Sequence, residues 1–108
     1  MDLVKKVKEI TIEDEEFIMT FDMQSIATYK ELTNRFFSKG ITELFKQNDE
    51  EVVYFIASIL RRKATPTVPL GRKVIDGDTL FFLLNLKNIA IEIIAESLPN
   101  DENSSKKK

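Results

Sequence analysis

Few residues in this chain have the types and spacing needed for chemistry, and they fall in three short segments. The four carboxylates Glu13–Glu16 are of the type that binds metals or serves in acid–base catalysis, but they stand between two apolar runs, as a solvated turn does. Asp76-Gly77-Asp78 resembles a fragment of a calcium loop, yet the regular ligand spacing and the closing Glu are missing. Gly71-Arg72-Lys73 lacks the flanking glycines and the Ser or Thr of a phosphate-binding loop. We therefore predict no catalytic site, no metal site and no cofactor, and a protein that is not an enzyme.

The composition leads to the same expectation. The chain of 108 residues has no His and no Cys, so the commonest general base near neutral pH and the commonest soft metal ligands are missing. Its formal net charge of −2 is too small to attract nucleic acid or anionic lipid over long distances. The first residues show no secretory signal, and polar residues interrupt the longest apolar segment, so we expect a cytoplasmic protein without a membrane span.

Two groups of basic residues flank a proline-containing segment. The first group is Arg61 and Arg62, followed by Lys63, and the second is Arg72 and Lys73. In the simplest interpretation the first group complements the dipole at the end of a helix and the second keeps a loop solvated. Alternatively, the two groups form one patch that binds an acidic protein or, as in a small regulatory protein, nucleic acid. Nucleic acid is the weaker of these two partners, because the chain as a whole is acidic.

The segment Leu80–Leu98 (LFFLLNLKNIAIEIIAESL) is the most apolar part of the chain. On a helix its Asn and Glu residues gather in one stripe roughly 80° wide, and nearly all other positions are Leu, Ile, Phe or Ala. A surface helix needs only one apolar face, so the pattern predicts either a core helix or a core helix that also binds a partner. In the second case we expect Phe81, Phe82, Leu84 and Ile91 to bind the partner. Arg61, Arg62, Arg72 and Lys73 would then form a secondary contact.

Alternating residues near the N-terminus predict a β-hairpin. Lys6–Ile12 forms the first strand and Phe17–Phe21 the second, with Phe17, Met19 and Phe21 on one face. The acidic segment between the two strands contains no Gly or Asn. A tight turn of two residues with positive φ angles is therefore not expected.

Helical periodicity and capping residues predict the rest of the first half. Ser25 is the expected N-cap of a helix that reaches about Ser38. Gly40 stands where a left-handed C-terminal cap is needed, and Ile41–Gln47 is expected to form a short helical turn.

A second amphipathic helix is predicted to reach about Lys63, with either Asn48 or Asp49 as its N-cap. Asn48 and Glu51 are spaced as in a capping box. The segment Ala64–Gly77 contains all but one of the prolines of the chain and is predicted to be a loop, either ordered or mobile. Asp78 is the expected cap of the last helix.

These elements predict an α+β fold, in which an N-terminal β-hairpin packs on a bundle of three to four α-helices with the C-terminal helix central. We expect residues 1–98 to form a single globular domain. Residues 100–108 have no apolar side chain, and 99–108 are expected to be a disordered polar tail.

The order of the elements, together with three short motifs, resembles the tail assembly chaperones of long-tailed bacteriophages and prophages. The motifs are Phe21-Asp22-Met23-Gln24-Ser25-Ile26, Ser38-Lys39-Gly40-Ile41 and Asn48-Asp49-Glu50-Glu51-Val52-Val53, and the match covers roughly Ile10 to Leu98. The resemblance implies a non-enzymatic protein that self-associates and covers the apolar, helical tape measure protein until tail tube subunits polymerise around it. The expected partners are then a tape measure-like protein, the tail tube protein and other copies of the chain, in the cytoplasm of a bacterial host.

Overall fold

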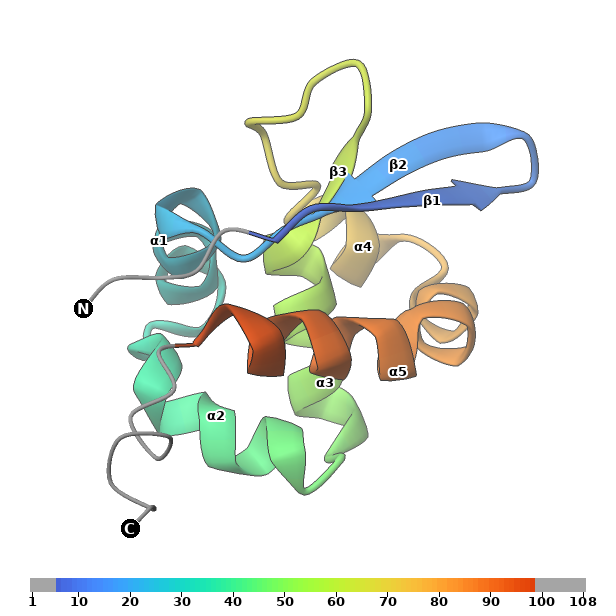
Figure 1. Ribbon diagram of the computed structural model, residues 1–108. Helices are drawn as coiled ribbons and strands as arrows, with labels where there is room; N and C mark the ends of the chain where they lie inside the picture. Colours follow the sequence, from blue (N-terminus) through green and yellow to red (C-terminus); the bar gives the residue numbers. More distant parts are fainter. Residues whose placement is uncertain (1–5, 99–108) are drawn as a thin grey trace, which may run out of the picture.

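In the computed structural model, which describes residues 6–98, a three-stranded antiparallel sheet lies beside five helices (Figure 1). The strands are β1 (Lys8–Ile12), β2 (Glu15–Met19) and β3 (Leu60–Arg62). The helices are α1 (Met23–Thr33), α2 (Phe37–Phe45), α3 (Asp49–Ile59), α4 (Arg72–Asp76) and α5 (Thr79–Ser97). The predicted α+β fold with an N-terminal hairpin and a long C-terminal helix is confirmed. The tail predicted at 99–108 lies outside the described residues.

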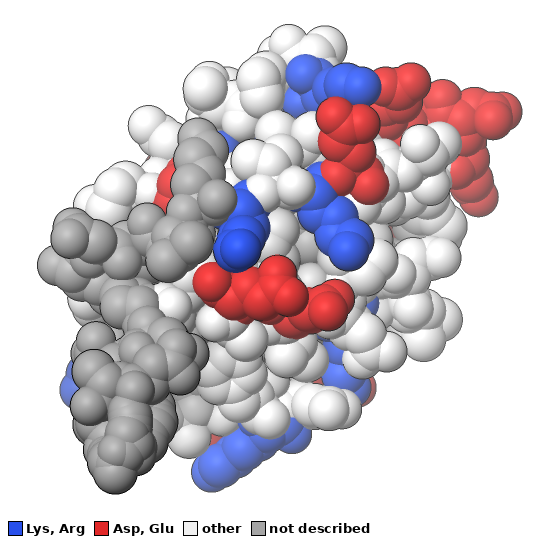
Figure 2. Space-filling model, viewed as in Figure 1, with Lys and Arg blue, Asp and Glu red and all other residues white. Residues whose placement is uncertain are grey.

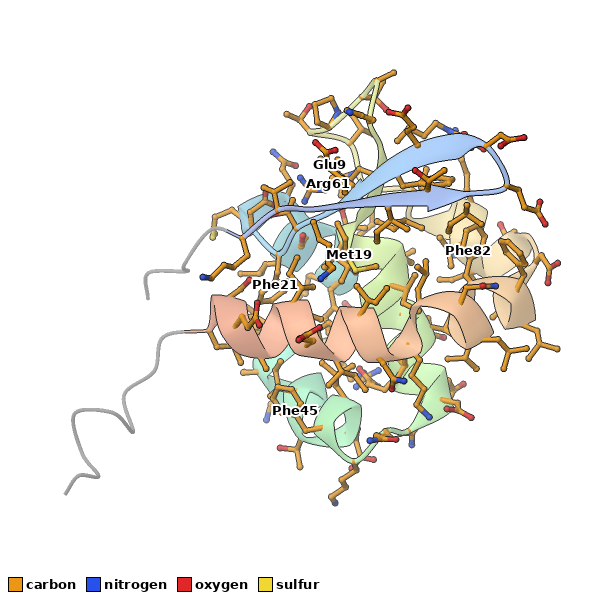
Figure 3. All side chains as sticks on the ribbon, turned by 45° about the vertical axis from the view of Figure 1, so that its right-hand side comes forward. Glu9, Met19, Phe21, Phe45, Arg61 and Phe82 are labelled. Atoms are coloured by element: carbon orange, nitrogen blue, oxygen red, sulfur yellow. The ribbon has the colours of Figure 1, made fainter. Side chains whose placement is uncertain are left out.

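The strands of the sheet lie in the order β1-β2-β3. Figure 1 shows α3 and α5 on one side of the sheet and the loop between β3 and α4 on the other. Since both faces of β2 are covered, all residues from Phe17 to Phe21 are buried, although their alternation predicts a single apolar face. Met19 and Phe21 lie between the hairpin and α5 (Figure 3).

Strand β3 corrects one prediction. The helical pattern continues to about Lys63, but α3 ends at Ile59 and the chain turns into a strand that pairs with β2. The Thr20 amide donates to the Ile59 carbonyl at 3.2 Å, and the Lys63 amide donates to the Glu16 carbonyl at 3.1 Å. Pairing with a distant segment therefore outweighs the local helical preference of this stretch.

The hairpin turn is also tighter than predicted. It consists of Glu13 and Asp14, whose φ angles of 51° and 70° are both positive, and the flanking Ile12 and Glu15 are paired. This is a primed turn, formed without the Gly or Asn that usually favours it. The pairing of Ile10 with Phe17 directs both side chains toward the core, and that register leaves two residues for the turn.

The double substitution Glu13→Asn/Asp14→Gly is expected to raise the free energy of unfolding by about 1–2 kcal/mol, because Asn and Gly adopt positive φ angles at a lower steric cost. Urea denaturation measures the change. Glu16→Asn, in β2, is the control and is not expected to stabilise the fold. A double variant no more stable than the parent would contradict the argument.

The first helix has different ends from those predicted. Asp22, not Ser25, is the N-cap: its carboxylate accepts from the Ser25 amide at 3.1 Å, and the Ser25 hydroxyl accepts from the Asp22 amide at 3.2 Å. The helix ends at Asn34, which takes the left-handed conformation with a φ angle of 59°. Gly40 is therefore not a cap and lies inside α2.

The segment predicted as a loop is held in place by main-chain hydrogen bonds. The Leu70 amide donates to the Leu60 carbonyl at 2.9 Å, and the Gly71 amide donates to the Ala57 carbonyl at 2.8 Å. Gly71 has a φ angle of 58° and precedes the short helix α4, which the sequence did not predict. The loop is thus an ordered cover of the sheet, built around a glycine that must adopt a positive φ.

Candidate functional site

Helix α5 is fixed at its start and in its middle. The Asp78 carboxylate accepts from the Phe81 amide at 3.1 Å, which confirms the predicted cap. The Lys87 amine donates to the Asp49 carboxylate at 2.8 Å and so joins the middle of α5 to the start of α3. Leu86 and Ala90 are buried on the side of α5 that faces the core. These contacts determine which side of the helix faces solvent.

Large apolar side chains remain on the outer side of α5. Leu80 is 62% exposed and Leu84, one turn later, is 74% exposed. Ile91 follows seven residues after Leu84, a spacing that returns to the same face of a helix, and it is half-buried. Leu80, Leu84 and Ile91 are called the α5 stripe below. Lys87, three residues after Leu84 and four before Ile91, lies on the same face of the helix, so the stripe is an apolar surface that one basic side chain interrupts.

Of the residues predicted to bind a partner through this helix, Leu84 is the most exposed. Phe81 and Phe82 are half-buried and make an edge-to-face pair with ring centroids 5.6 Å apart. Phe82 lies on the side of α5 that faces the hairpin (Figure 3) and packs against the core. Leu80 was not among the residues predicted to bind a partner, although its position one turn before Leu84 places it on the same face of the helix.

A further large apolar side chain is exposed at the end of α2. Phe45, the last residue of that helix, is 42% exposed and lies below α5 in the view of Figure 3. The short turn after it leads to Asp49, which Lys87 contacts. The start of α3 therefore adjoins the middle of α5.

The basic surface in the structure differs from the one predicted from the sequence, because Arg61 is buried. Its side chain is 1% exposed and makes a bidentate ion pair with Asp22, with Nη2 at 2.6 Å from Oδ1 and Nη1 at 3.0 Å from Oδ2. The same guanidinium donates to the Ser25 hydroxyl at 2.9 Å and to the Pro66 carbonyl at 3.0 Å. The prediction that Arg61 contacts a partner assumed an exposed side chain, and this assumption is wrong. Arg61 points to the outer face of the sheet, where the loop covers it.

The other basic residues are exposed, and carboxylates neutralise most of them. Arg62 pairs with Glu15, and Arg72 pairs with Asp76 at 3.5 Å. Lys63 contacts Glu16 at 3.2 Å, and its hydrogen bond to this carboxylate raises the pKa of the amine. Of the predicted secondary contacts, Lys73 is exposed on α4. This pairing lowers the positive potential that a polyanion would meet.

A buried polar cluster that was not predicted joins α1, α3 and the segment between α1 and α2. The Tyr29 hydroxyl donates to Glu51 Oε2, and Arg35 Nη2 contacts Glu51 Oε1 at 3.1 Å. The Glu51 side chain is only 7% exposed. Burial and the neighbouring Glu51 carboxylate raise the pKa of Tyr29 well above its ordinary value. Glu51 thus follows Asn48, as in a capping box, but its carboxylate turns into the interior, where it binds Tyr29 of α1 and Arg35 of the segment that leads to α2.

Gly40 provides the space for this cluster. A Cβ atom at Gly40 would overlap Tyr29 Oη and Glu51 Oε2. The ring of Tyr29 also stacks on Phe55 with centroids 4.5 Å apart. We therefore assign these residues to the stability of the helical part rather than to a binding site.

A hollow of about 440 Å³ lies between α1 and the end of the loop. Thr28 and Leu32 line it on the helix, and Val68, Pro69 and Arg72 line it on the other side.

Within residues 6–98, no group of three or more His, Cys, Asp or Glu side chains is placed to hold a metal ion.

No helix in the described part of the chain is both long and apolar enough to cross a bilayer.

The chain matches no protein-family model. It also matches no curated protein and no solved structure.

Proposed function

We propose that this chain is a non-catalytic tail assembly chaperone that covers apolar helical segments of a tape measure-like protein with the α5 stripe. The observation that carries the proposal is the exposure of Leu80 and Leu84, at 62% and 74%, on a helix whose other side is fixed in the core. Full burial of one Leu side chain contributes about 1.5–3 kcal/mol. A partner that covers both side chains therefore gains a substantial free energy of binding.

The geometry suits a helical partner. The α5 stripe presents side chains at positions i, i+4 and i+11, which is the spacing that one helix offers to another packed along it. Phe45, at the end of α2, is a further exposed aromatic side chain and lies below α5 in the view of Figure 3. The order of the elements, which resembles that of phage tail assembly chaperones, supports the same role.

The same surface explains the expected self-association. Until the tape measure-like protein is present, a second copy is the apolar partner most available to the α5 stripe. We therefore propose oligomers that dissociate when the partner binds, in the cytoplasm of a bacterial host, before the tail tube protein replaces the chaperone. Sedimentation at several concentrations measures this association.

The test uses the double variant Leu80→Ser/Leu84→Ser in co-expression with a tape measure protein of a long-tailed phage. Capture of that protein is expected to fall at least tenfold, because the apolar contact area is lost. Both side chains are exposed, so the free energy of unfolding is expected to change by no more than about 0.5 kcal/mol.

The matched control is Met23→Ser/Val68→Ser, which removes two apolar side chains that are 68% and 58% exposed elsewhere on the surface. This control is expected to capture the partner as the parent chain does. Equal capture by the parent and the α5 variant, or equal losses in the two variants, would contradict the proposed surface.

A further inference from the structure

Strand β1 is the open edge of the sheet. In the order β1-β2-β3 it has a neighbouring strand on one side only within residues 6–98 (Figure 1). The opposite edge is covered by the loop after β3, because the Leu70 amide donates to the Leu60 carbonyl at 2.9 Å. A strand with an unpaired side presents a row of main-chain N–H and C=O groups to which a further strand can bind.

The register of the hairpin shows which main-chain groups of β1 are free. Ile12 pairs with Glu15 across the two-residue turn, so Ile12 and, two residues earlier, Ile10 exchange hydrogen bonds with β2. The direction of these groups alternates along a strand, and the N–H and C=O groups of Glu9 and Thr11 therefore point away from β2. These four groups are called the free edge below.

The side chains next to the free edge are apolar on the helix side of the sheet. Ile10 pairs with the buried Phe17 and so points toward the helices, as does Ile12 two residues later. Both are only half-buried, since no strand covers this side of β1 among the described residues. Glu9 points to the other side of the sheet (Figure 3), where it contacts Lys63 at 3.6 Å. A strand added to β1 would therefore cover Ile10 and Ile12 with its own inward side chains.

Charges of both signs lie beside the free edge. A cleft of about 150 Å³ separates the start of β1 from α5, and Lys6, Lys8, Glu92 and Glu96 are among the residues that line it. Figure 2 shows basic side chains directly above a row of acidic ones on the face that carries β1 and α5. Because the two signs lie so close together, this surface favours neither a strongly acidic nor a strongly basic segment.

We propose that the free edge binds an extended, uncharged segment of another protein as a fourth, antiparallel strand, with apolar residues on the side of Ile10 and Ile12. Only an extended chain places N–H and C=O groups at the two-residue spacing of Glu9 and Thr11. This surface is distinct from the α5 stripe, so the inference goes beyond the proposed function. A second copy fits less well, because full overlap of two β1 strands places Lys8 of one copy opposite Ile12 of the other.

Two labelled synthetic peptides test the inference. Both alternate Val with Thr, and one carries N-methyl groups on its Thr residues whereas the other carries them on its Val residues. When the Val side chains face Ile10 and Ile12, the Thr amides of the peptide face β1, so methylation of Thr removes the hydrogen bonds to the free edge and methylation of Val keeps them. Fluorescence anisotropy measures binding to the full chain. The Val-methylated peptide is expected to bind at least tenfold more tightly.

Two substitutions of Thr11 locate the binding surface. Thr11→Pro removes an N–H of the free edge but no hydrogen bond to β2, and it is expected to weaken binding of the Val-methylated peptide at least fivefold. Thr11→Val keeps the N–H and is expected to bind as the parent does. Circular dichroism verifies that both variants are folded. In the parent chain, the amide hydrogens of Glu9 and Thr11 are expected to exchange faster than those of Ile10 and Ile12, and to slow down when the peptide binds.

The outcomes separate this inference from the proposed function. Equal affinities of the two peptides, or binding of neither, would overturn the strand addition and leave the α5 stripe untouched. Leu80→Ser/Leu84→Ser is expected to bind the peptide as the parent does, and a loss there would show that the peptide binds the stripe instead. If sedimentation shows weaker self-association of Thr11→Pro than of Thr11→Val, a second copy occupies the free edge, and the inference also fails.

Discussion

Arg61→Met is expected to lower the free energy of unfolding by about 3 kcal/mol, because it removes one member of a buried ion pair. The substitution leaves the Asp22 carboxylate without its bidentate donor and removes hydrogen bonds to the Ser25 hydroxyl and the Pro66 carbonyl. Asp22 is also the N-cap of α1, so its position affects the start of that helix. Urea denaturation followed by circular dichroism measures the loss.

The control for this prediction is the next residue in the chain. Arg62 is 45% exposed and pairs with Glu15, and an exposed ion pair of this kind contributes only about 0–1 kcal/mol. Arg62→Met is therefore expected to have a much smaller effect. In Arg61→Met the loop after β3 is expected to become more sensitive to proteases, since Arg61 ties its Pro66 carbonyl to the sheet. Equal effects of the two substitutions would show that the buried pair contributes no more than the exposed one.

Gly40→Ala is expected to lower the free energy of unfolding by about 3 kcal/mol or more, although the same change in an ordinary helix stabilises by about 1 kcal/mol. The added methyl group would overlap the Tyr29 hydroxyl and the Glu51 carboxylate, so their buried hydrogen bond would have to break or α2 would have to shift. Either response leaves polar groups without partners in the interior or opens the contact between helices. Thermal or urea denaturation measures the loss.

A double substitution identifies the cause. Tyr29→Phe removes the hydroxyl that a Cβ atom at Gly40 would meet, so Gly40→Ala should cost less in the Tyr29→Phe background than in the parent. Part of the loss should remain, because Glu51 Oε2 also occupies this space. A Gly40→Ala variant as stable as the parent would contradict the proposed packing. If the losses of stability in Gly40→Ala and Tyr29→Phe add up exactly in the double variant, the Tyr29 hydroxyl is not the cause of the loss in Gly40→Ala.

Several features of the fold could be predicted because their signals are local. Asp78 stands directly before the long apolar segment, and it caps α5 as its position suggests. Alternating apolar residues locate β2, and Asn48 caps α3. The exposed surface was only partly predictable, since the sequence of α5 is apolar around most of its circumference and does not show which side packs on α3. Leu84 is 74% exposed, whereas Phe82 and Ile91 are half-buried and pack against the core.

The α+β class, the position of the hairpin and of the last helix, and the surplus of apolar residues in that helix could all be predicted from local sequence. These properties follow from neighbouring residues, through periodicity and capping. In contrast, the strand Leu60–Arg62, the burial of Arg61 and the space that Gly40 leaves for Tyr29 and Glu51 became apparent only in the folded chain. Each of these depends on a partner far away in the chain, such as β2 for β3 or Asp22 for Arg61, and a local pattern contains no information about which distant segment will be its neighbour.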